Sequence, residues 1–373
     1  MSQQIKPTQK KQYKILLFVN LIVVFVLLLT YLSVYINPND FKYIAIIGLA
    51  YPVVIFVNII FGLIWLFLDY KKAFISFICL LLGWHQFSDT FQINTSNIKD
   101  TSNSFKVLTY NVRMFDKYNW IKEKGTASQI IEFINDENPD ILCLQEFFSN
   151  DTDSLDVRQK LKNIFKSNYK HIVFASEGSK IYNYGIATYS TYPIVNKGSI
   201  KYEDSKEISI FSDIVINEDT IRFYNCHLES VHFAYEDYHF IDSLSVADSK
   251  TNKMQKFRKI VSKLLNAYVI RAVQSQIISE HIKKSPYPVI VAGDFNDTPI
   301  SYVYNKVSKN LEDAFVNSGS GTGSTYSYNF FNMRIDYILY DNLLESYDFK
   351  THKINLSDHF PVSCRFVTKK IKD

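Results

Sequence analysis

The chain has 373 residues, enough for one large domain or two smaller ones, and its formal net charge of +4 is too small to argue for nucleic-acid binding by itself. Its composition, 47% hydrophobic and 21% charged, is that of an ordinary globular protein, but this average conceals a very apolar N-terminal region and a mixed remainder. The four cysteines show no Cys-x-x-Cys spacing, which argues against a zinc site or a redox motif.

The N-terminal region contains long uncharged runs. Ile15 to Ile36 is long enough to span a bilayer as a helix, and so is Tyr43 to Leu68. The turn-forming residues 37–40 separate them and predict a helical hairpin. A third run, Ala73 to Trp84, is apolar but short, and two interpretations stay open: an interfacial or re-entrant helix, or a third span.

The loop charges decide which side of a membrane the rest of the chain would occupy. Lysines precede the first run, and Lys71 and Lys72 precede the third; lysines in loops favour the cytoplasm. Two spans would leave the rest of the chain in the cytoplasm, and three would carry it across. We predict three spans and an extracytoplasmic remainder, because nothing else explains so apolar a run after a charged loop. The absence of charges within the runs argues against a transporter.

These patterns divide the chain into three parts. Residues 1–91 are expected to be a transmembrane anchor of two or three helices in contact with the lipid bilayer, so that the protein is an integral membrane protein. Residues 92–104 are expected to be a polar linker, and residues 105–373 one folded domain. Nothing in the sequence implies an obligate protein partner.

Strand patterns dominate the third part. Alternating or buried apolar runs predict strands at 105–112, 141–147, 184–194, 207–216, 220–228, 288–296, 334–340 and 361–367. Helical spacing appears at 126–140, ending before Pro139, and over Lys253 to Lys284. Strands interrupted by helices predict an α/β sandwich, with two packed sheets and helices outside.

Polar side chains stand at the ends of these apolar strands. They are Asn111, Glu146, Asn225, His227, Asp294, Asn296, Asp336, Asp358 and His359. Each of these residues taken alone is more often a turn former. A set of oxygen and imidazole donors without a thiolate, however, indicates a functional site. Such donors favour magnesium, manganese or calcium over zinc.

The ordered series YNVR, LQEF, NCHLES, GDFN, RIDY and SDHFP resembles the endonuclease/exonuclease/phosphatase superfamily over Phe105 to Val367. The resemblance implies a four-layer α/β sandwich with two mostly antiparallel sheets flanked by helices. It also implies a metal-dependent phosphodiesterase that uses Mg²⁺ or Mn²⁺ and acts on nucleic acid, phospholipid or a small phosphodiester. A catalytically inactive, membrane-tethered domain that binds a phosphate ligand is the alternative, although the complete set of motifs argues against it.

The resemblance also implies a role for each matched residue. Glu146, Asn111 and Asp358 would be on the metal side. Asp294 would orient or activate the attacking water, Asn296 would hold a phosphate oxygen, and His359, fixed by Asp336, would contact the scissile phosphate. His227 would donate to the phosphate or leaving group, with Asn225 supporting it on the substrate side. Arg113 stands where abasic-site endonucleases carry an acid. It is expected either to clamp phosphate or to pair with a neighbouring acid.

Overall fold

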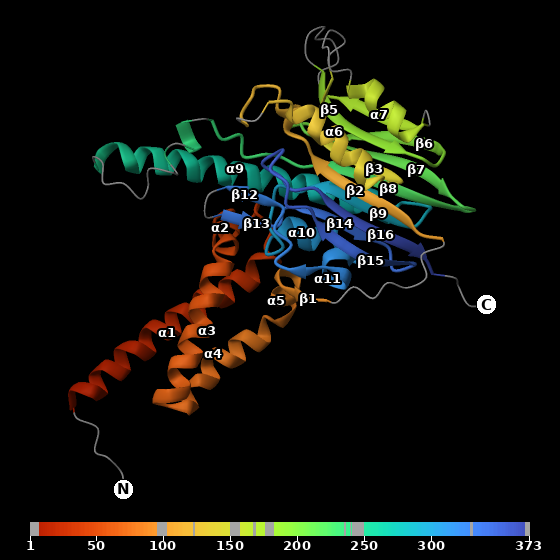
Figure 1. Ribbon diagram of the computed structural model, residues 1–373. Helices are drawn as coiled ribbons and strands as arrows, with labels where there is room; N and C mark the ends of the chain where they lie inside the picture. Colours follow the sequence, from red (N-terminus) through yellow and green to blue (C-terminus); the bar gives the residue numbers. More distant parts are fainter. Residues whose placement is uncertain are drawn as a thin grey trace.

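The computed structural model describes residues 7–94, 103–121, 124–149, 157–166, 169–175, 183–234, 236–238, 240, 250–328 and 331–369. A bundle of helices projects from a larger domain built on two sheets (Figure 1).

The helical part comprises α1 (Pro7–Ser33), α2 (Tyr43–Leu49), α3 (Tyr51–Leu68), α4 (Tyr70–Leu82) and α5 (Trp84–Thr90). Among the described residues, Lys11–Ser33 and Tyr51–Leu68 are long and apolar enough to cross a membrane. The expected second run is divided at Ala50, because Pro52 lies in the first turn of α3 and cannot continue a helix from α2. The third apolar run forms α4, which has 13 residues.

Buried polar groups hold α4 against the other two long helices. Asn20 of α1 donates to Ser76 Oγ of α4 at 3.0 Å and accepts from Trp65 Nε1 of α3 at 3.1 Å. Nearer the domain, the Tyr31 hydroxyl donates to the Cys79 carbonyl. The chain therefore runs toward the domain in α1, away from it in α3 and back toward it in α4 (Figure 1).

The domain contains two six-stranded sheets. The first has the order β15 (Leu344–Thr351), β16 (Val362–Thr368), β2 (Phe105–Asn111), β3 (Ile141–Ser149), β5 (Asn183–Ser190), β4 (Lys170–Phe174). The second has the order β10 (Glu312–Asp313), β14 (Asp336–Tyr340), β9 (Val289–Asp294), β8 (Asp219–His227), β7 (Ile208–Ile216), β6 (Ile194–Lys201). Each sheet is antiparallel except for one central parallel pair, β2 with β3 and β8 with β9.

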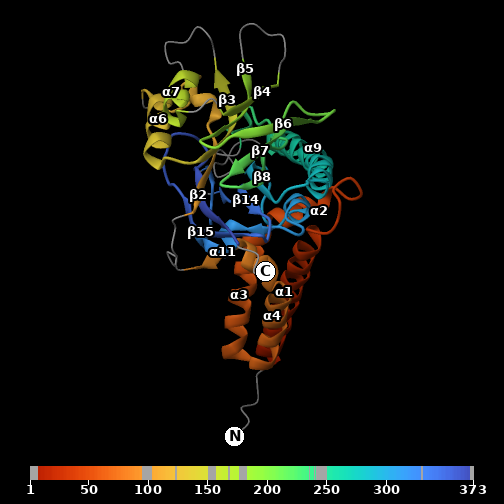
Figure 2. The ribbon, with the colours of Figure 1, turned by 90° about the vertical axis from the view of Figure 1, so that its right-hand side faces the viewer.

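Helices cover the outer face of each sheet, as Figure 2 shows. The first sheet is covered by α6 (Thr126–Glu137) and α7 (Val157–Phe165), and the second by α9 (Lys250–Lys283) and α10 (Tyr302–Val307). A continuous apolar core lies between the sheets and includes Phe105, Ile141, Phe223, Ile290 and Val362. The prediction of a four-layer α/β sandwich is confirmed.

Short elements complete the domain: η1 (Arg113–Asp116), α11 (Ala314–Ser318), the pair β1 (Gln92–Ile93) with β11 (Ser320–Gly321), and the pair β12 (Tyr326–Tyr328) with β13 (Phe331–Met333). Because β1 pairs with β11, the first residues of the expected linker are attached to the domain. Residues 95–102 of that linker lie outside the described residues.

Two strands differ from the sequence expectation. The run at 184–194 forms two strands in different sheets, because the turn at 191–193 contains Pro193. The strand expected to end at Phe147 continues to Ser149, and its pairing with β5 shifts between Leu144 and Phe147. This bulge places Glu146 at a positive φ of 50° within the strand rather than at its end.

Candidate functional site

The two central parallel pairs bring polar side chains to one edge of the sandwich. Asn111 ends β2, His227 ends β8 and Asp294 ends β9. Carboxyl ends of parallel strands meet at one edge, and the two sheets are stacked, so these residues converge. Asp336 begins β14 directly opposite Asp294, and His359 precedes β16.

Asp294 is fully buried at the centre of this group. Its Oδ2 accepts a hydrogen bond from Asn111 Nδ2 at 3.0 Å and lies 3.8 Å from His227 Nε2 and 3.7 Å from His359 Nε2. The preceding Gly293 has a φ of 138°, and a Cβ there would lie 2.0 Å from a backbone oxygen of β8. Only glycine allows β9 to lie this close to β8, and this packing positions Asp294 at the edge of the stacked sheets.

Each histidine that faces Asp294 is held by a second carboxylate. Asp336 Oδ2 lies 2.9 Å from His359 Nδ1, and Glu207 Oε2 lies 2.7 Å from His227 Nδ1. A carboxylate at Nδ1 fixes the ring and leaves Nε2 directed at Asp294.

The surrounding carboxylates favour the charged form of both rings. Burial alone would lower the pKa of His227, but the carboxylates of Glu207, Asp294 and Glu146 together outweigh it and the pKa rises to about 9. Burial also lowers the pKa of His359, and the carboxylates of Asp336 and Asp294 raise it well above the ordinary value. Both histidines are therefore cationic at neutral pH in this geometry.

Glu207 and Tyr184 were not among the sequence-predicted residues. Glu207 is buried just before β7, and the Tyr184 hydroxyl donates to its Oε2 at 3.1 Å. The one signal in the sequence was a carboxylate at the head of the apolar run 207–216.

Glu146, Asn111, Asp358 and Arg113 form the other side of the site. Asn111 Nδ2 lies 3.3 Å from Glu146 Oε1, and burial, together with the charges of Asp358 and Glu207, raises the pKa of Glu146. Arg113 Nε lies 3.4 Å from Asp358 Oδ2, and its guanidinium stacks 4.4 Å from the centre of the Trp120 ring. Arg113 thus pairs with a neighbouring acid, the second of its two expected roles.

The donor set suits a hard divalent cation. Buried carboxylates repel one another here, and Asp336 Oδ1 is buried without a hydrogen-bond partner among the described residues. In that part of the chain, Asp294, Asp336 and His359 are the group whose ligand atoms all lie within 4.8 Å of one another. The hydrogen bond between His359 and Asp336 accounts for part of that proximity.

Two expected site residues are used to support the structure. Asn225 is fully buried; it accepts from Gln145 Nε2 at 2.7 Å and donates to the Ala187 carbonyl at 2.9 Å. It therefore links the two sheets, and its expected role on the substrate side stays a prediction. The Asn296 side chain donates to the Leu228 carbonyl at 2.9 Å, and its backbone N–H donates to Asp294 Oδ1 at 2.7 Å, which fixes the loop after β9.

Comparison with known proteins gives two family matches. Residues 108–359 match the model of the Endonuclease/Exonuclease/phosphatase family, and residues 13–90 match that of a domain of unknown function, DUF8431. No curated protein matches.

Two solved structures with a TM-score of 0.50 share the fold at low sequence identity, and a third is reported beside them. A functionally unknown conserved protein from Enterococcus faecalis V583 is 17% identical with a TM-score of 0.50, over 71% of this chain and 100% of that chain. An endonuclease/exonuclease/phosphatase from Beutenbergia cavernae DSM 12333 is 14% identical with a TM-score of 0.50, over 71% and 72% of the two chains. Truncated Caenorhabditis elegans TDP2 is 18% identical with a TM-score of 0.47, over 71% and 98%.

Proposed function

Because the chain belongs to the endonuclease/exonuclease/phosphatase family, we propose that it is a divalent-metal-dependent phosphodiesterase held at a lipid bilayer by its N-terminal helices. The observation that carries this proposal is the pair of histidines, each fixed by a carboxylate, that face Asp294 from two sides. The complete set also disfavours a domain that only binds a phosphate ligand.

The cation site is assigned to Glu146, with Asn111 and Asp358 beside it. A bound Mg²⁺ or Mn²⁺ would supply Lewis-acid polarisation of a phosphate oxygen. Asn111 donates to both Glu146 and Asp294, so it positions the two carboxylates relative to each other. In this proposal Arg113, which is partly exposed and pairs with Asp358, contacts the substrate at the rim of the site.

The protein's own groups handle charge and protons. Asp294 orients or activates the attacking water, and His359, cationic through its contact with Asp336, stabilises negative charge on the phosphate. His227 donates to a phosphate or leaving-group oxygen, and Glu207 keeps it protonated. Asn296 has two roles in this proposal: it fixes the loop that follows Asp294, and it contacts a phosphate oxygen.

The N-terminal helices supply the proposed membrane anchor. Large apolar side chains such as Phe18, Phe25, Val53 and Phe67 are exposed on the bundle. An exposed apolar belt of this extent favours lipid as its neighbour. We propose three spans, with α4 as the third, and an integral membrane protein whose domain of residues 105–373 works beside the bilayer.

The decisive experiment is turnover by the purified full-length chain in detergent. The substrates are DNA, RNA, sphingomyelin, phosphoinositides and a bis-aryl phosphodiester, each with EDTA, Mg²⁺ or Mn²⁺. We expect at least one substrate to be hydrolysed only with metal, and His359→Ala to lower kcat by about 100-fold or more. Undiminished turnover in metal-free buffer, or a fully active and folded His359→Ala protein, would refute the proposal.

A further inference from the structure

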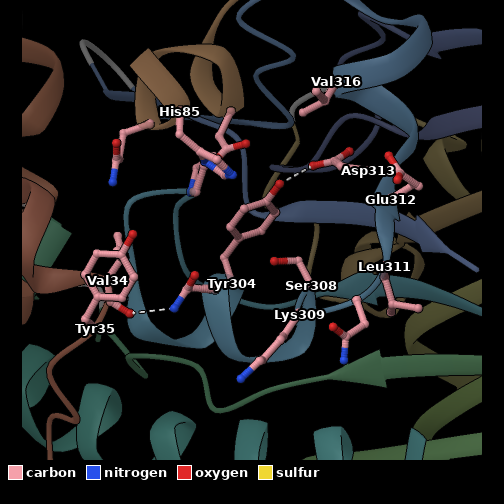
Figure 3. Close-up of a pocket in the computed structure, with 15 residues that line it drawn as sticks. Val34, Tyr35, His85, Tyr304, Ser308, Lys309, Leu311, Glu312, Asp313 and Val316 are labelled. Atoms are coloured by element: carbon pink, nitrogen blue, oxygen red, sulfur yellow. Dashed lines mark hydrogen bonds and ion pairs between the residues drawn. The ribbon is translucent and has the colours of Figure 1, made fainter. Parts of the chain in front are cut away.

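A cavity lies away from the proposed active site, where the helical bundle meets the domain (Figure 3). Its volume is about 500 Å³, and its lining comes from the residues just after α1, from α5 and from the stretch that runs from α10 into α11. The Asn305 side chain closes one side by donating to the Val34 carbonyl at 3.0 Å. The cavity therefore belongs to both parts of the chain, and neither part forms it alone.

The buried polar lining of the cavity comprises one amide and two carboxylates. Gln86, Asp89 and Asp313 line it and are 7%, 9% and 6% exposed. Gln86 Oε1 is buried and has no hydrogen-bond partner within the described residues. A buried amide oxygen without a donor costs free energy, which a ligand with an N–H group would recover.

The charges along the cavity are graded. Asp313 Oδ2 lies 2.6 Å from Arg334 Nη1, and Asp89 Oδ2 lies 2.9 Å from His85 Nδ1; burial nevertheless raises the pKa of Asp89 to about 6. Glu312 and Lys309 are exposed and lie nearer to solvent, as does His85. Two carboxylates in the interior and Lys309 at the mouth, beside Glu312, fit a ligand whose positive end enters first and whose negative end stays outside.

A single metal ion does not fit this arrangement. The cavity carboxylates do not form a group with ligand atoms within 4.8 Å of one another, whereas Asp294, Asp336 and His359 do in the same described part of the chain. The volume is also that of a small organic ligand rather than of an ion. The cavity lies just beyond the end of the apolar bundle, at the level where lipid headgroups would lie, with Tyr35 and the neighbouring Trp84 exposed there.

We propose that this cavity binds a phosphoethanolamine group, with its primary ammonium at Gln86 and Asp89 and its phosphate at Lys309. The group is presented as the headgroup of a phospholipid, which makes the junction a specific lipid site. This inference relies on the proposed membrane anchor for the source of the ligand, but not on hydrolysis at the other site.

The test is native mass spectrometry of the full-length chain in detergent with an equimolar mixture of phosphatidylethanolamine, phosphatidylcholine and phosphatidylglycerol of the same acyl chains. We expect phosphatidylethanolamine to be retained preferentially. Phosphatidylcholine has no N–H for Gln86 Oε1, and phosphatidylglycerol has no cation for the acidic interior. Free phosphoethanolamine, added as competitor, should displace the lipid. If it binds while the three lipids are retained equally, the ligand is a soluble phosphoethanolamine compound and the lipid source is wrong.

Variants locate the binding. Gln86→Leu and Lys309→Ala should each weaken retention of phosphatidylethanolamine by about tenfold, the usual size of a lost charge-assisted hydrogen bond. Lys201→Ala, an exposed lysine of β6 in the far strand of the second sheet, is the matched control and should bind as the unchanged chain does. Lys309 is exposed, so its replacement tests the site even where Gln86→Leu fails to fold. Equal retention of all three lipids, or an unchanged preference in Lys309→Ala, overturns the proposal.

Discussion

Glu207 touches His227 and not the reacting atoms, so its contribution at the residue scale is to position and charge that ring. We predict that Glu207→Gln lowers kcat by roughly tenfold, because the amide still accepts a hydrogen bond but no longer favours the cationic ring. The loss should be greatest at alkaline pH, since without the carboxylate the pKa of His227 falls from about 9 toward neutrality.

A double-mutant cycle separates this role from a structural one. If Glu207 acts only through His227, Glu207→Gln should cost almost nothing once His227→Ala is present. The check is kcat over a pH series for both single variants and the double variant. Independent, multiplicative losses would show that Glu207 acts elsewhere in the site.

His171 predicts a pH dependence of stability that is separate from catalysis. It is buried in β4 and faces Ser212 of the other sheet at 3.2 Å, and burial, with the charge of Lys197, lowers its pKa from 6.5 to about 4. Above pH 6.5 the ring is neutral in both the folded and the unfolded chain, so its contribution is complete. As the pH falls from 6.5 toward about 4, the unfolded chain binds the proton first and stability is lost.

The measurement is the midpoint of thermal unfolding between about pH 7 and about pH 4.5. His171→Gln, which can keep a hydrogen bond to Ser212, should show a shallower decline than the unchanged chain. Parallel curves would mean that the histidine is protonated in the folded state as readily as in the unfolded one.

At the scale of elements, the sequence was most informative where a strand's own apolar pattern and polar end sufficed to place a side chain. The polar ends of β2, β8 and β9 were predictable, because an apolar strand that stops at Asn111, His227 or Asp294 delivers that side chain to the edge of its sheet. The bulge at Glu146 was not, since it depends on the register with β5. Glu207 was missed because it stands at the start of its strand, and only the neighbouring strand β8 brings it to His227.

The edge strand β15 was missed for a different reason. Leu344–Thr351 alternates poorly, is largely half-exposed and contains Asp348 at a positive φ of 54°, so periodicity carries little signal there. The division between α2 and α3 was likewise hidden inside one apolar run. The strand β15 is set by its pairing with β16, whereas the α2–α3 break follows Pro52 inside a run whose apolar character conceals it.

The elements α5 and β1 predict that the domain does not begin cleanly at residue 105. Arg334, which is 4% exposed, donates from Nη2 to the Asp89 carbonyl at 2.6 Å, and β1 pairs with β11. We predict that fragment 103–373 folds but is less stable than fragment 84–373 by about 1–3 kcal/mol, the cost of leaving a buried polar group unpaired. Urea unfolding of the two fragments measures the difference, and coincident midpoints would show that residues 84–102 add nothing.

At the scale of the whole molecule, the direction of the three long helices relates the domain to the two ends of the bundle. The start of α1, with Lys10, Lys11 and Lys14, and the α3–α4 corner lie at the end far from the domain (Figure 1). At that corner Asp69 accepts from the Lys71 backbone and pairs with Lys72 at 3.1 Å. Apart from Lys42, which caps α2 at the domain-facing end, these lysines therefore lie at the end of the bundle far from the domain.

This arrangement predicts an extracytoplasmic domain, because lysine-rich ends stay in the cytoplasm and an odd number of passes separates them from the domain. Protease added to intact spheroplasts should digest the domain while a cytoplasmic marker protein stays whole. Cysteine labelling gives an independent reading, since all four native cysteines are buried. A membrane-impermeant maleimide should label Lys170→Cys in intact spheroplasts and Lys71→Cys only after lysis. The reverse pattern, with a domain protected until the cells are opened, would place the domain in the cytoplasm. It would also show that α4 does not cross the membrane.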